Sequence, residues 1–269
     1  MSRTIIIATL LVAATIGANG HDLASSHLLR KKALSATPLK KLPSAVRWDS
    51  GPVHTTGAMG NGASVWAMVD TLGGCAAAQD TVYDYPSLSY SEIAVCASNP
   101  QSTQFDFRAA AKDLIDRKNG LVARNGTFDP EFDGTNEQAV RAQCSNEHVA
   151  AARLERIEEI TNDRVKLMEH IAYRGPVFVG INAVPLQTYQ GGILRCPAAS
   201  TTTDAYMVVV GYDHSDHMNG NGFWIVKAAW GANWGENGHA RVSMEDGACG
   251  IGKIGFSAHM MRLAGTKLH

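Results

Sequence analysis

The chain has 269 residues, of which 45% are hydrophobic and 18% are charged, and its formal net charge is −1. This length and apolar content are enough to bury a full core, as one large domain or as two lobes. A nearly neutral charge gives no support for a nucleic-acid partner or for binding to an anionic membrane surface.

Residues 1–20 are typical of a secretory signal peptide. Arg3 supplies the basic flank, residues 4–16 are apolar, and residues 18–20 offer small side chains for cleavage. The apolar run is too short to span a bilayer comfortably, and an uncleaved signal anchor is the alternative interpretation. We expect a secreted or endolysosomal protein with no membrane span after signal removal, in which residues 21–41 form a short polar leader or linker.

The secretory pathway would oxidise cysteines, and the chain has five. They are candidates for two disulfide bonds with one cysteine left over, while five unpaired cysteines are the alternative. Their positions are Cys75, Cys96, Cys144, Cys196 and Cys249. One N-glycosylation sequon occurs, at Asn125-Gly126-Thr127 in a polar segment, which predicts a glycan on Asn125.

A glycine-rich stretch at residues 57–68 leads into a helical pattern. Ser64 is a good N-cap, and Gly73-Gly74 is the expected end of the helix. A glycine-rich turn at a helix N-terminus favours an anion, or a thiolate whose pKa must fall. The residue before Trp66 is Val65, however, which can be neither an anion nor a nucleophile.

More helices are expected in the first half of the chain. Residues 89–92 (Ser-Tyr-Ser-Glu) form a capping box that predicts a second short helix, and residues 107–118 predict a third. Residues 126–143 are acidic and irregular.

Strands dominate after residue 150. An amphipathic helix over residues 162–173 precedes apolar runs typical of strands. These runs cover residues 177–181, 206–212, 223–226 and 240–243. Helices followed by strands predict an α+β fold, with a mainly helical lobe over residues 42–150 packed on a mainly β lobe over residues 151–269.

One cluster of metal-ligand types stands out. Asp213, His214, Asp216 and His217 lie within five residues, and they are ligand types for zinc or a similar ion. A solvated hairpin loop is the simpler interpretation. No cofactor is expected elsewhere.

Several motifs, in this order, resemble the papain family of cysteine peptidases. Residues 227–238 (Lys-Ala-Ala-Trp-Gly-Ala-Asn-Trp-Gly-Glu-Asn-Gly) resemble the family's K-N-S-W-G-x-x-W-G-E-x-G. Residues 175–177 resemble its G-P-V strand, and residues 204–212 resemble its D-H-A…V-G-Y strand. Residues 59–68 correspond to its Q-G-x-C-G-S-C-W-A-F, which carries the nucleophile.

The resemblance runs from about Leu42 to the end of the chain. Residues 119–122 and 246–251 look most like the cathepsin B-like branch of the family. The resemblance implies a papain-like two-lobed fold, with a helical left lobe and an antiparallel, β-barrel-like right lobe. It also implies that Trp66 and Trp230 are framework residues of the cleft wall.

Four positions that carry the family's chemistry hold apolar residues here. Val65 stands at the nucleophile, Ala205 at the imidazole, Ala228 at the asparagine that orients the imidazole, and Met59 at the glutamine that donates to the oxyanion. That chemistry needs a thiolate, a base with its orienting group, and an oxyanion donor. We therefore predict a non-catalytic binding protein that lacks proteolytic activity. Its partner would be a protein ligand such as a cathepsin inhibitor, or an unrelated surface partner.

The resemblance also implies which cysteines pair. It predicts bridges Cys96–Cys144 and Cys196–Cys249, and it leaves Cys75 over. The family's substrate-backbone run C-N-G-G corresponds to residues 103–106. Phe105 and Asp106 are expected to crowd that rim, since glycine lets an extended peptide approach closely.

A hydrolase with a relocated nucleophile is the alternative function. Ser64 lies beside the altered nucleophile position, and His54 lies upstream of it. The simpler interpretation makes Ser64 an N-cap and His54 a surface loop residue. A hydrolase built from them would need a hydrogen bond between the two side chains.

Overall fold

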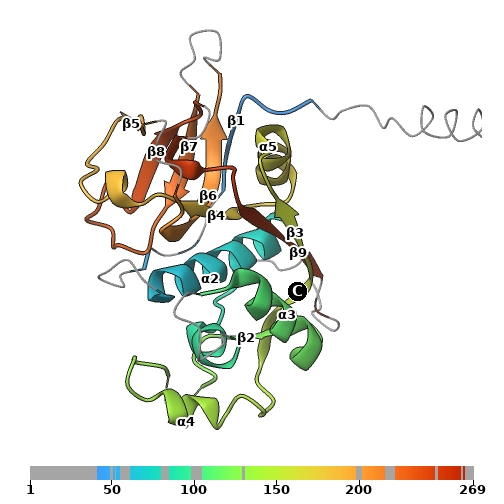
Figure 1. Ribbon diagram of the computed structural model, residues 1–269. Helices are drawn as coiled ribbons and strands as arrows, with labels where there is room; N and C mark the ends of the chain where they lie inside the picture. The colour runs from blue at the N-terminus through green and yellow to red at the C-terminus, as the bar shows by residue number, and fades with distance from the viewer. Residues whose placement is uncertain are drawn as a thin grey trace, which may run out of the picture. The chain divides into compact units, whose positions relative to one another are not determined.

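The computed structural model (Figure 1) describes residues 41–48, 51, 53–54, 61–79, 85–97, 105–128, 131–197, 202–215, 222–245, 248–261 and 263. The chain divides into two units, residues 1–41 and 42–269, and the fold of the second is described below. The expected signal peptide lies outside the described residues. Within the described ranges, every helix is too short or too polar to cross a bilayer.

Helix α2 (Asn61–Ala78) is the longest helix of the described residues. It begins before Ser64 and continues through Gly73-Gly74, so the predicted N-cap and the predicted stop are both wrong. A Cβ atom on the first glycine would lie 2.8 Å from the Tyr85 ring, and one on the second would lie 2.5 Å from Pro176. The two glycines therefore allow close packing inside the helix rather than ending it.

The predicted capping box forms in part. Helix η1 (Glu92–Cys96) is a single π-helical turn, and the Glu92 N–H donates to the Ser89 hydroxyl at 3.2 Å. The Ser89 N–H, which a full box directs to the Glu92 carboxylate, donates to the Ala123 carbonyl at 2.9 Å. The Glu92 carboxylate accepts instead from the Ala123 N–H at 2.7 Å, and so joins η1 to a strand.

Three further α-helices follow. Helix α3 (Phe107–Lys118) has the predicted bounds, and α5 (Arg164–Tyr173) is capped by the Asp163 side chain, which accepts from the Lys166 N–H. Helix α4 (Glu137–Arg141) lies in the segment that was expected to be irregular, which corrects that expectation. Within the described ranges, η2 (Val184–Leu186) and η4 (Ala248–Gly250) are short 3₁₀ turns.

The described strands form one sheet. They are β1 (Ala45–Arg47), β2 (Leu121–Ala123), β3 (Ala150–Ile160), β4 (Val177–Ile181), β5 (Ile193–Leu194), β6 (Ala205–Asp213), β7 (Phe223–Lys227), β8 (His239–Ser243) and β9 (Gly255–Met261). Their order is β2-β3-β9-β4-β6-β7-β8-β5, with β1 paired to β6. Every described pair is antiparallel except β5 with β8.

Helix α2 lies between two groups of elements (Figure 1). Strands β4 to β8 lie on one side of it, and α3, α4 and β2 lie on the other. Helix α2 contacts β6 and β9, and its buried residues share a core cluster with those of α3. A second core cluster lies among α5, β4 and β6 to β8. The division of the chain at residue 150 stays a prediction. Strand β1 falls within the range of the expected helical lobe, but it pairs with β6 of the expected β lobe.

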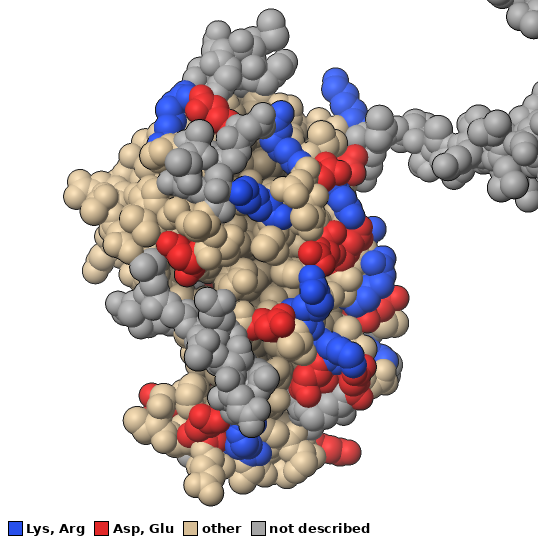
Figure 2. Space-filling view, in the orientation of Figure 1, with Lys and Arg blue, Asp and Glu red and all other residues tan. Residues whose placement is uncertain are grey.

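The charged side chains of one face are mixed in sign. Figure 2 shows Lys and Arg interspersed with Asp and Glu on this face, rather than gathered into a patch of one sign. Within the described ranges, side chains of opposite charge form ion pairs, such as Arg108 with Glu159 and Lys112 with Asp116. The face drawn therefore offers no basic patch of the kind that binds nucleic acid.

Candidate functional site

Helix α2, strand β6 and the residue after β7 hold three of the four positions at which the resemblance predicts altered catalytic residues. Val65 lies in the first turns of α2 with 4% of its surface exposed. Ala205 is half-buried at the start of β6, and Ala228 is buried directly after β7. Met59 lies outside the described residues. Because valine and alanine side chains hold no proton and donate no hydrogen bond, these three positions supply no acid, base or nucleophile.

Both predicted cleft-wall tryptophans pack against other rings. The half-buried Trp66 ring stacks on His54, with centroids 3.4 Å apart and an interplanar angle of 12°, and its centroid lies 4.6 Å from that of Tyr90. Trp230 meets Trp234 edge to face at 4.8 Å. Such ring pairs add stability beyond the burial of their area. The rings thus have a packing role, and a cleft-wall role stays a prediction.

A buried ionic cluster lies beneath Trp66. Lys227 Nζ lies 2.9 Å from Asp70 Oδ2, and the two side chains are only 1% and 4% exposed. His54 Nε2 lies 3.3 Å from Asp70 Oδ1, and Lys227 Nζ also donates to the Gly51 carbonyl at 3.4 Å. His54 lies in a loop, as expected, but the surface part of that expectation is wrong, because its side chain is 17% exposed and packs on Trp66 beside the carboxylate.

Sequence reasoning did not find this cluster. Asp70 lies on the buried face of α2. Lys227 begins the motif of residues 227–238, which was recognised by its tryptophans and glycines. The available signal was a charged residue within an apolar helix, since buried charges need a partner. The sequence alone did not identify that partner.

Cys75, the cysteine that belongs to neither predicted bridge, is fully buried in α2. Its thiol donates to the Pro176 carbonyl at 3.2 Å. Burial raises the pKa of the Cys75 thiol to about 12, although a hydrogen bond with the Ala258 backbone and the charge of Arg174 act in the opposite direction. A thiolate is the nucleophilic form of cysteine, so this side chain is unreactive while it is buried.

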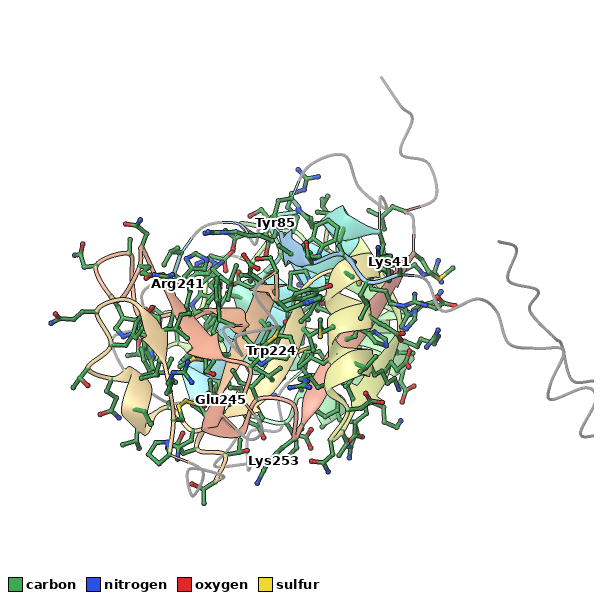
Figure 3. All side chains as sticks on the ribbon, turned by 90° about the horizontal axis from the view of Figure 1, so that it is seen from above. Lys41, Tyr85, Trp224, Arg241, Glu245 and Lys253 are labelled. Carbon is green, nitrogen blue, oxygen red and sulfur yellow. A yellow bond between two sulfur atoms is a disulfide. The ribbon has the colours of Figure 1, made fainter. Side chains whose placement is uncertain are left out.

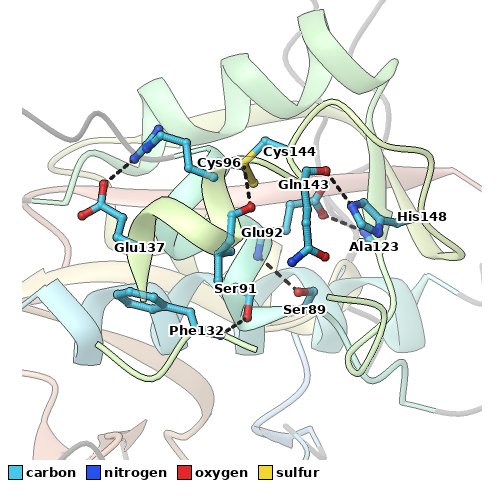
Figure 4. The surroundings of a disulfide bond; sticks show 12 residues. Ser89, Ser91, Glu92, Cys96, Ala123, Phe132, Glu137, Gln143, Cys144 and His148 are labelled. Carbon is cyan, nitrogen blue, oxygen red and sulfur yellow. Dashed lines mark hydrogen bonds and ion pairs between the residues drawn. A yellow bond between two sulfur atoms is a disulfide. The ribbon is translucent and has the colours of Figure 1, made fainter. Parts of the chain in front are cut away.

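The other four cysteines form both predicted bridges, Cys96–Cys144 and Cys196–Cys249. Figure 4 shows the first bridge, which ties η1 to the segment after α4. Beside it, the two ring nitrogens of His148 face the carbonyls of Thr127 and Gln143 at 3.2 and 3.0 Å. On the loop-entropy account each bridge stabilises the fold by about 4 kcal/mol.

The predicted glycosylation site is accessible. Asn125 is exposed at a turn where Gly126 has a φ of +79°, and the glycan stays a prediction.

Phe105 does not crowd the rim of the substrate-backbone run as expected. Its ring is buried in the core, 6.4 Å from that of Phe178. Asp106 is exposed, and its carboxylate caps α3.

The described residues of the candidate metal cluster have other partners. Asp213 Oδ1 accepts from the Ser215 N–H and hydroxyl. His214 Nε2 lies 3.2 Å from the Pro43 carbonyl. Asp216 and His217 lie outside the described residues. Within the described ranges, no three His, Cys, Asp or Glu side chains are grouped so that they could hold a metal ion.

A hollow of about 240 Å³ opens in the β-rich half. Trp224, Met244 and Ile251 give it apolar walls, and Arg164, Glu245 and Lys253 are among its charged lining residues. Figure 3 labels Trp224, Glu245 and Lys253 of this set. Its lining includes no residue of α2, so the hollow is distinct from the site around Val65.

Comparison with known proteins identifies the family. The family profile described as "Papain family cysteine protease" matches residues 42–259. The oryzain beta chain of Oryza sativa subsp. japonica is 29% identical over 225 residues, which are 79% of this chain and 46% of that protein. Cysteine protease 1 of the same plant is 31% identical over 230 residues, which are 79% of this chain and 44% of that protein. The chain spans less than half the length of either relative.

Solved structures give the same fold. The bromelain protease from Ananas comosus in complex with the E64 inhibitor matches with a TM-score of 0.67 at 21% identity, over 82% of this chain and 100% of that chain. Identity at this level supports the fold alone. The expected papain-like α+β fold is confirmed.

Proposed function

The chain belongs to the papain family of cysteine proteases, and on that premise we propose that it acts as a non-catalytic binding protein that lacks peptidase activity. The observation that carries the proposal is the residue set at the family's catalytic positions. Val65, Ala205 and Ala228 replace a nucleophile, a base and the group that orients the base. Because losses within one catalytic unit are strongly non-additive, the loss of the nucleophile alone would remove most of the rate.

Cys75 does not restore the missing nucleophile. It lies ten residues after Val65 in α2, which places it about 15 Å further along the helix axis. Burial raises the pKa of this thiol to about 12, so it stays protonated at pH 7. The thiol would also have to leave the core before it could meet a peptide.

A position within the family is part of the proposal. The Asn119-Gly120 turn supports a cathepsin B-like branch, since residues 119–122 resemble that branch most. Both residues have positive φ angles, 52° and 76°, and a Cβ on Gly120 would lie against the Leu154 carbonyl. The turn is therefore a structural requirement of this chain as well as a point of resemblance.

The partner that we propose is a protein. One candidate is an inhibitor that normally binds active cathepsins, and the other is a partner of an unrelated surface. Val65, Ala205 and Ala228 give the altered site an apolar character, which suits an apolar side chain better than a charged one. Two disulfide bonds support an extracellular or endolysosomal location, because such bonds persist in oxidising compartments.

One observation favours the alternative, a hydrolase with a relocated nucleophile. The imidazole of His54 lies 3.3 Å from the Asp70 carboxylate, as a base lies beside its orienting group. Two observations oppose the relocated hydrolase. The Asp70 carboxylate also binds Lys227, and Ser64 is only 6% exposed in the first turn of α2. Peptide turnover that depends on both Ser64 and His54 would support this alternative.

The test is turnover of a complex peptide library by the purified protein from pH 4 to pH 8, with cleavage read by mass spectrometry. We expect no cleavage by the natural protein. The matched variant is the triple revertant Val65→Cys, Ala205→His and Ala228→Asn. An epoxide inhibitor of cysteine peptidases should label the revertant at residue 65 and leave the natural protein unlabelled.

Each outcome decides between the two functions. Cleavage by the natural protein that Ser64→Ala or His54→Ala abolishes would establish the hydrolase. Cleavage that survives both changes and is lost on Cys75→Ala would make the buried thiol the nucleophile. Binding is tested separately, by the affinity of a protein inhibitor of papain-family peptidases for the natural chain. Its failure to bind would leave an unrelated surface partner.

A further inference from the structure

Five charged or titratable side chains form a cluster that joins α5 to strands β3 and β9, and we call it the α5 clasp. They are Glu158 on β3, Lys166, His170 and Arg174 at or beside α5, and His259 on β9. The clasp contains none of the altered catalytic positions, and its two histidines are only 6% and 4% exposed.

The Glu158 carboxylate is the centre of the clasp. Lys166 Nζ lies 2.9 Å from Oε1 and His170 Nε2 lies 3.5 Å from it, while His259 Nε2 lies 3.1 Å from Oε2. Arg156, from the same strand, approaches Oε2 at 3.7 Å. Partial burial opposes ionisation of Glu158, but the hydrogen bonds from Lys166 and His259 outweigh it and lower its pKa to about 2. The carboxylate therefore stays charged through the mildly acidic range.

The geometry requires a neutral imidazole at His259. The Arg174 guanidinium lies 3.0 Å from His259 Nδ1, and a guanidinium can only donate. Nδ1 must therefore accept, which leaves the proton on Nε2, where it is donated to Glu158. A second proton on the ring would remove the bond to Arg174 and bring two positive charges together. Burial, together with the charges of Arg174 and Arg156, lowers the pKa of His259.

His170 also resists a second proton. Its Nε2 faces Glu158, and its buried Nδ1 has no hydrogen-bond partner. Protonation would place an N–H with no acceptor inside the core, which costs free energy. Burial lowers the pKa of His170 to about 4, against the attraction of Glu158 and together with the repulsion of Arg174, Lys166 and His259.

We propose that the α5 clasp is an acid-sensitive device, which holds α5 on the sheet at neutral pH and loosens it as the solution is acidified. In the closed clasp both imidazoles are neutral, whereas in an opened clasp each can take up a proton. Protons therefore bind preferentially to the open form, and mass action favours opening. Other hydrogen bonds to α5 do not titrate: the Gln79 side chain donates to the Arg174 carbonyl at 2.9 Å, and the Trp48 indole donates to the Ile171 carbonyl at 2.5 Å.

The direction follows from the lowered histidine pKa values. A histidine with a lowered pKa stabilises the closed form fully above its ordinary value of 6.5. That stability falls as the pH drops toward about 4 and levels off below it. From pH 7 to pH 5, the titration of His170 alone should raise the equilibrium constant for opening the clasp by about twentyfold. His259 adds to this in the same direction.

The test is hydrogen–deuterium exchange of the whole protein at pH 7, 6 and 5, with protection corrected for the intrinsic effect of pH. We expect the protection of α5 to fall about twentyfold or more between pH 7 and pH 5. The protection of β7 and β8, measured in the same samples, should fall much less. Unchanged protection of α5 would overturn the proposal, and so would a parallel loss across all three elements.

A matched pair of variants locates the effect. Gln at residue 259 can donate to Glu158 and accept from Arg174 without titrating, and Leu at residue 170 removes the unpaired nitrogen. We expect α5 of the His170→Leu, His259→Gln protein to keep its protection at pH 5. His239→Gln is the control, since burial also lowers the pKa of His239 but its ring contacts the Asn237 carbonyl. If the control removed the pH effect at α5, the clasp would not be its source.

Discussion

Asp70 is the residue whose surroundings differ most from what its sequence position suggests. Its carboxylate receives Lys227 on one side and His54 on the other, and the Tyr85 hydroxyl donates to its backbone carbonyl at 3.1 Å. Burying the two charges costs several kcal/mol each, and their attraction offsets this only while both are present. The cluster therefore holds the segment around His54 against α2, directly beneath Trp66.

Lys227→Met tests this cluster at the scale of one residue. The change keeps the apolar length of the side chain and leaves the Asp70 carboxylate without its ammonium. We expect the free energy of unfolding to fall by about 3–5 kcal/mol in urea denaturation. The double variant Lys227→Met, Asp70→Leu should recover most of this loss. A loss below about 1 kcal/mol in the single variant would mean that the pair behaves like an exposed ion pair.

At the scale of the element, α2 shows why local rules can mislead. Gly73-Gly74 is a strong stop signal by propensity. The helix nevertheless continues through both residues. They are glycines because Pro176 and Tyr85 approach these positions so closely that no side chain fits. The tertiary contact thus decides what the local sequence leaves open.

Gly74→Ala measures that contact. Alanine is the better helix former by about 1 kcal/mol, so an effect of propensity alone would stabilise the protein. Its Cβ would lie 2.5 Å from Pro176 Cγ, and we expect a net destabilisation of about 1–3 kcal/mol in thermal or urea unfolding. Gly191→Ala is the matched control, because its Cβ would meet only the Glu236 side chain at 3.6 Å. Stabilisation by Gly74→Ala would contradict the packing account.

Prediction succeeded where the local pattern and the tertiary environment agree. Residues 107–118 and 177–181 were predicted with the bounds that the structure has, because each carries the periodicity of its element. Strand β3 was missed, since Ala, Arg, Leu and Glu favour helices, and its pairing with β2 on one side and β9 on the other makes it a strand. The catalytic positions were assigned from the resemblance to the family's motifs, and their alteration stays a prediction. The Asp70–Lys227 pair was not predicted, because its members are far apart in the chain.

At the scale of the whole molecule, the two disulfide bonds and the buried thiol give a simple chemical count. We expect a thiol reagent to find no reactive thiol in the native protein at pH 7 and one per chain in strong denaturant without reductant. The native thiol is protected because Cys75 is fully buried and its pKa is about 12. Three or more thiols in denaturant would contradict the paired state of the other four cysteines. One reactive thiol in the native state would show that α2 opens around Cys75.

Strand β9 is the last described strand in the chain, yet it lies between two strands that precede it. It pairs with β3 along one edge and with β4 along the other, and it follows every other described strand in the chain. During synthesis on the ribosome, β3 and β4 therefore wait for the strand that lies between them, and their facing edges stay open until it emerges. A chaperone that covers unpaired strand edges would be needed most in this interval, and a translational pause just before residue 255 would lengthen it.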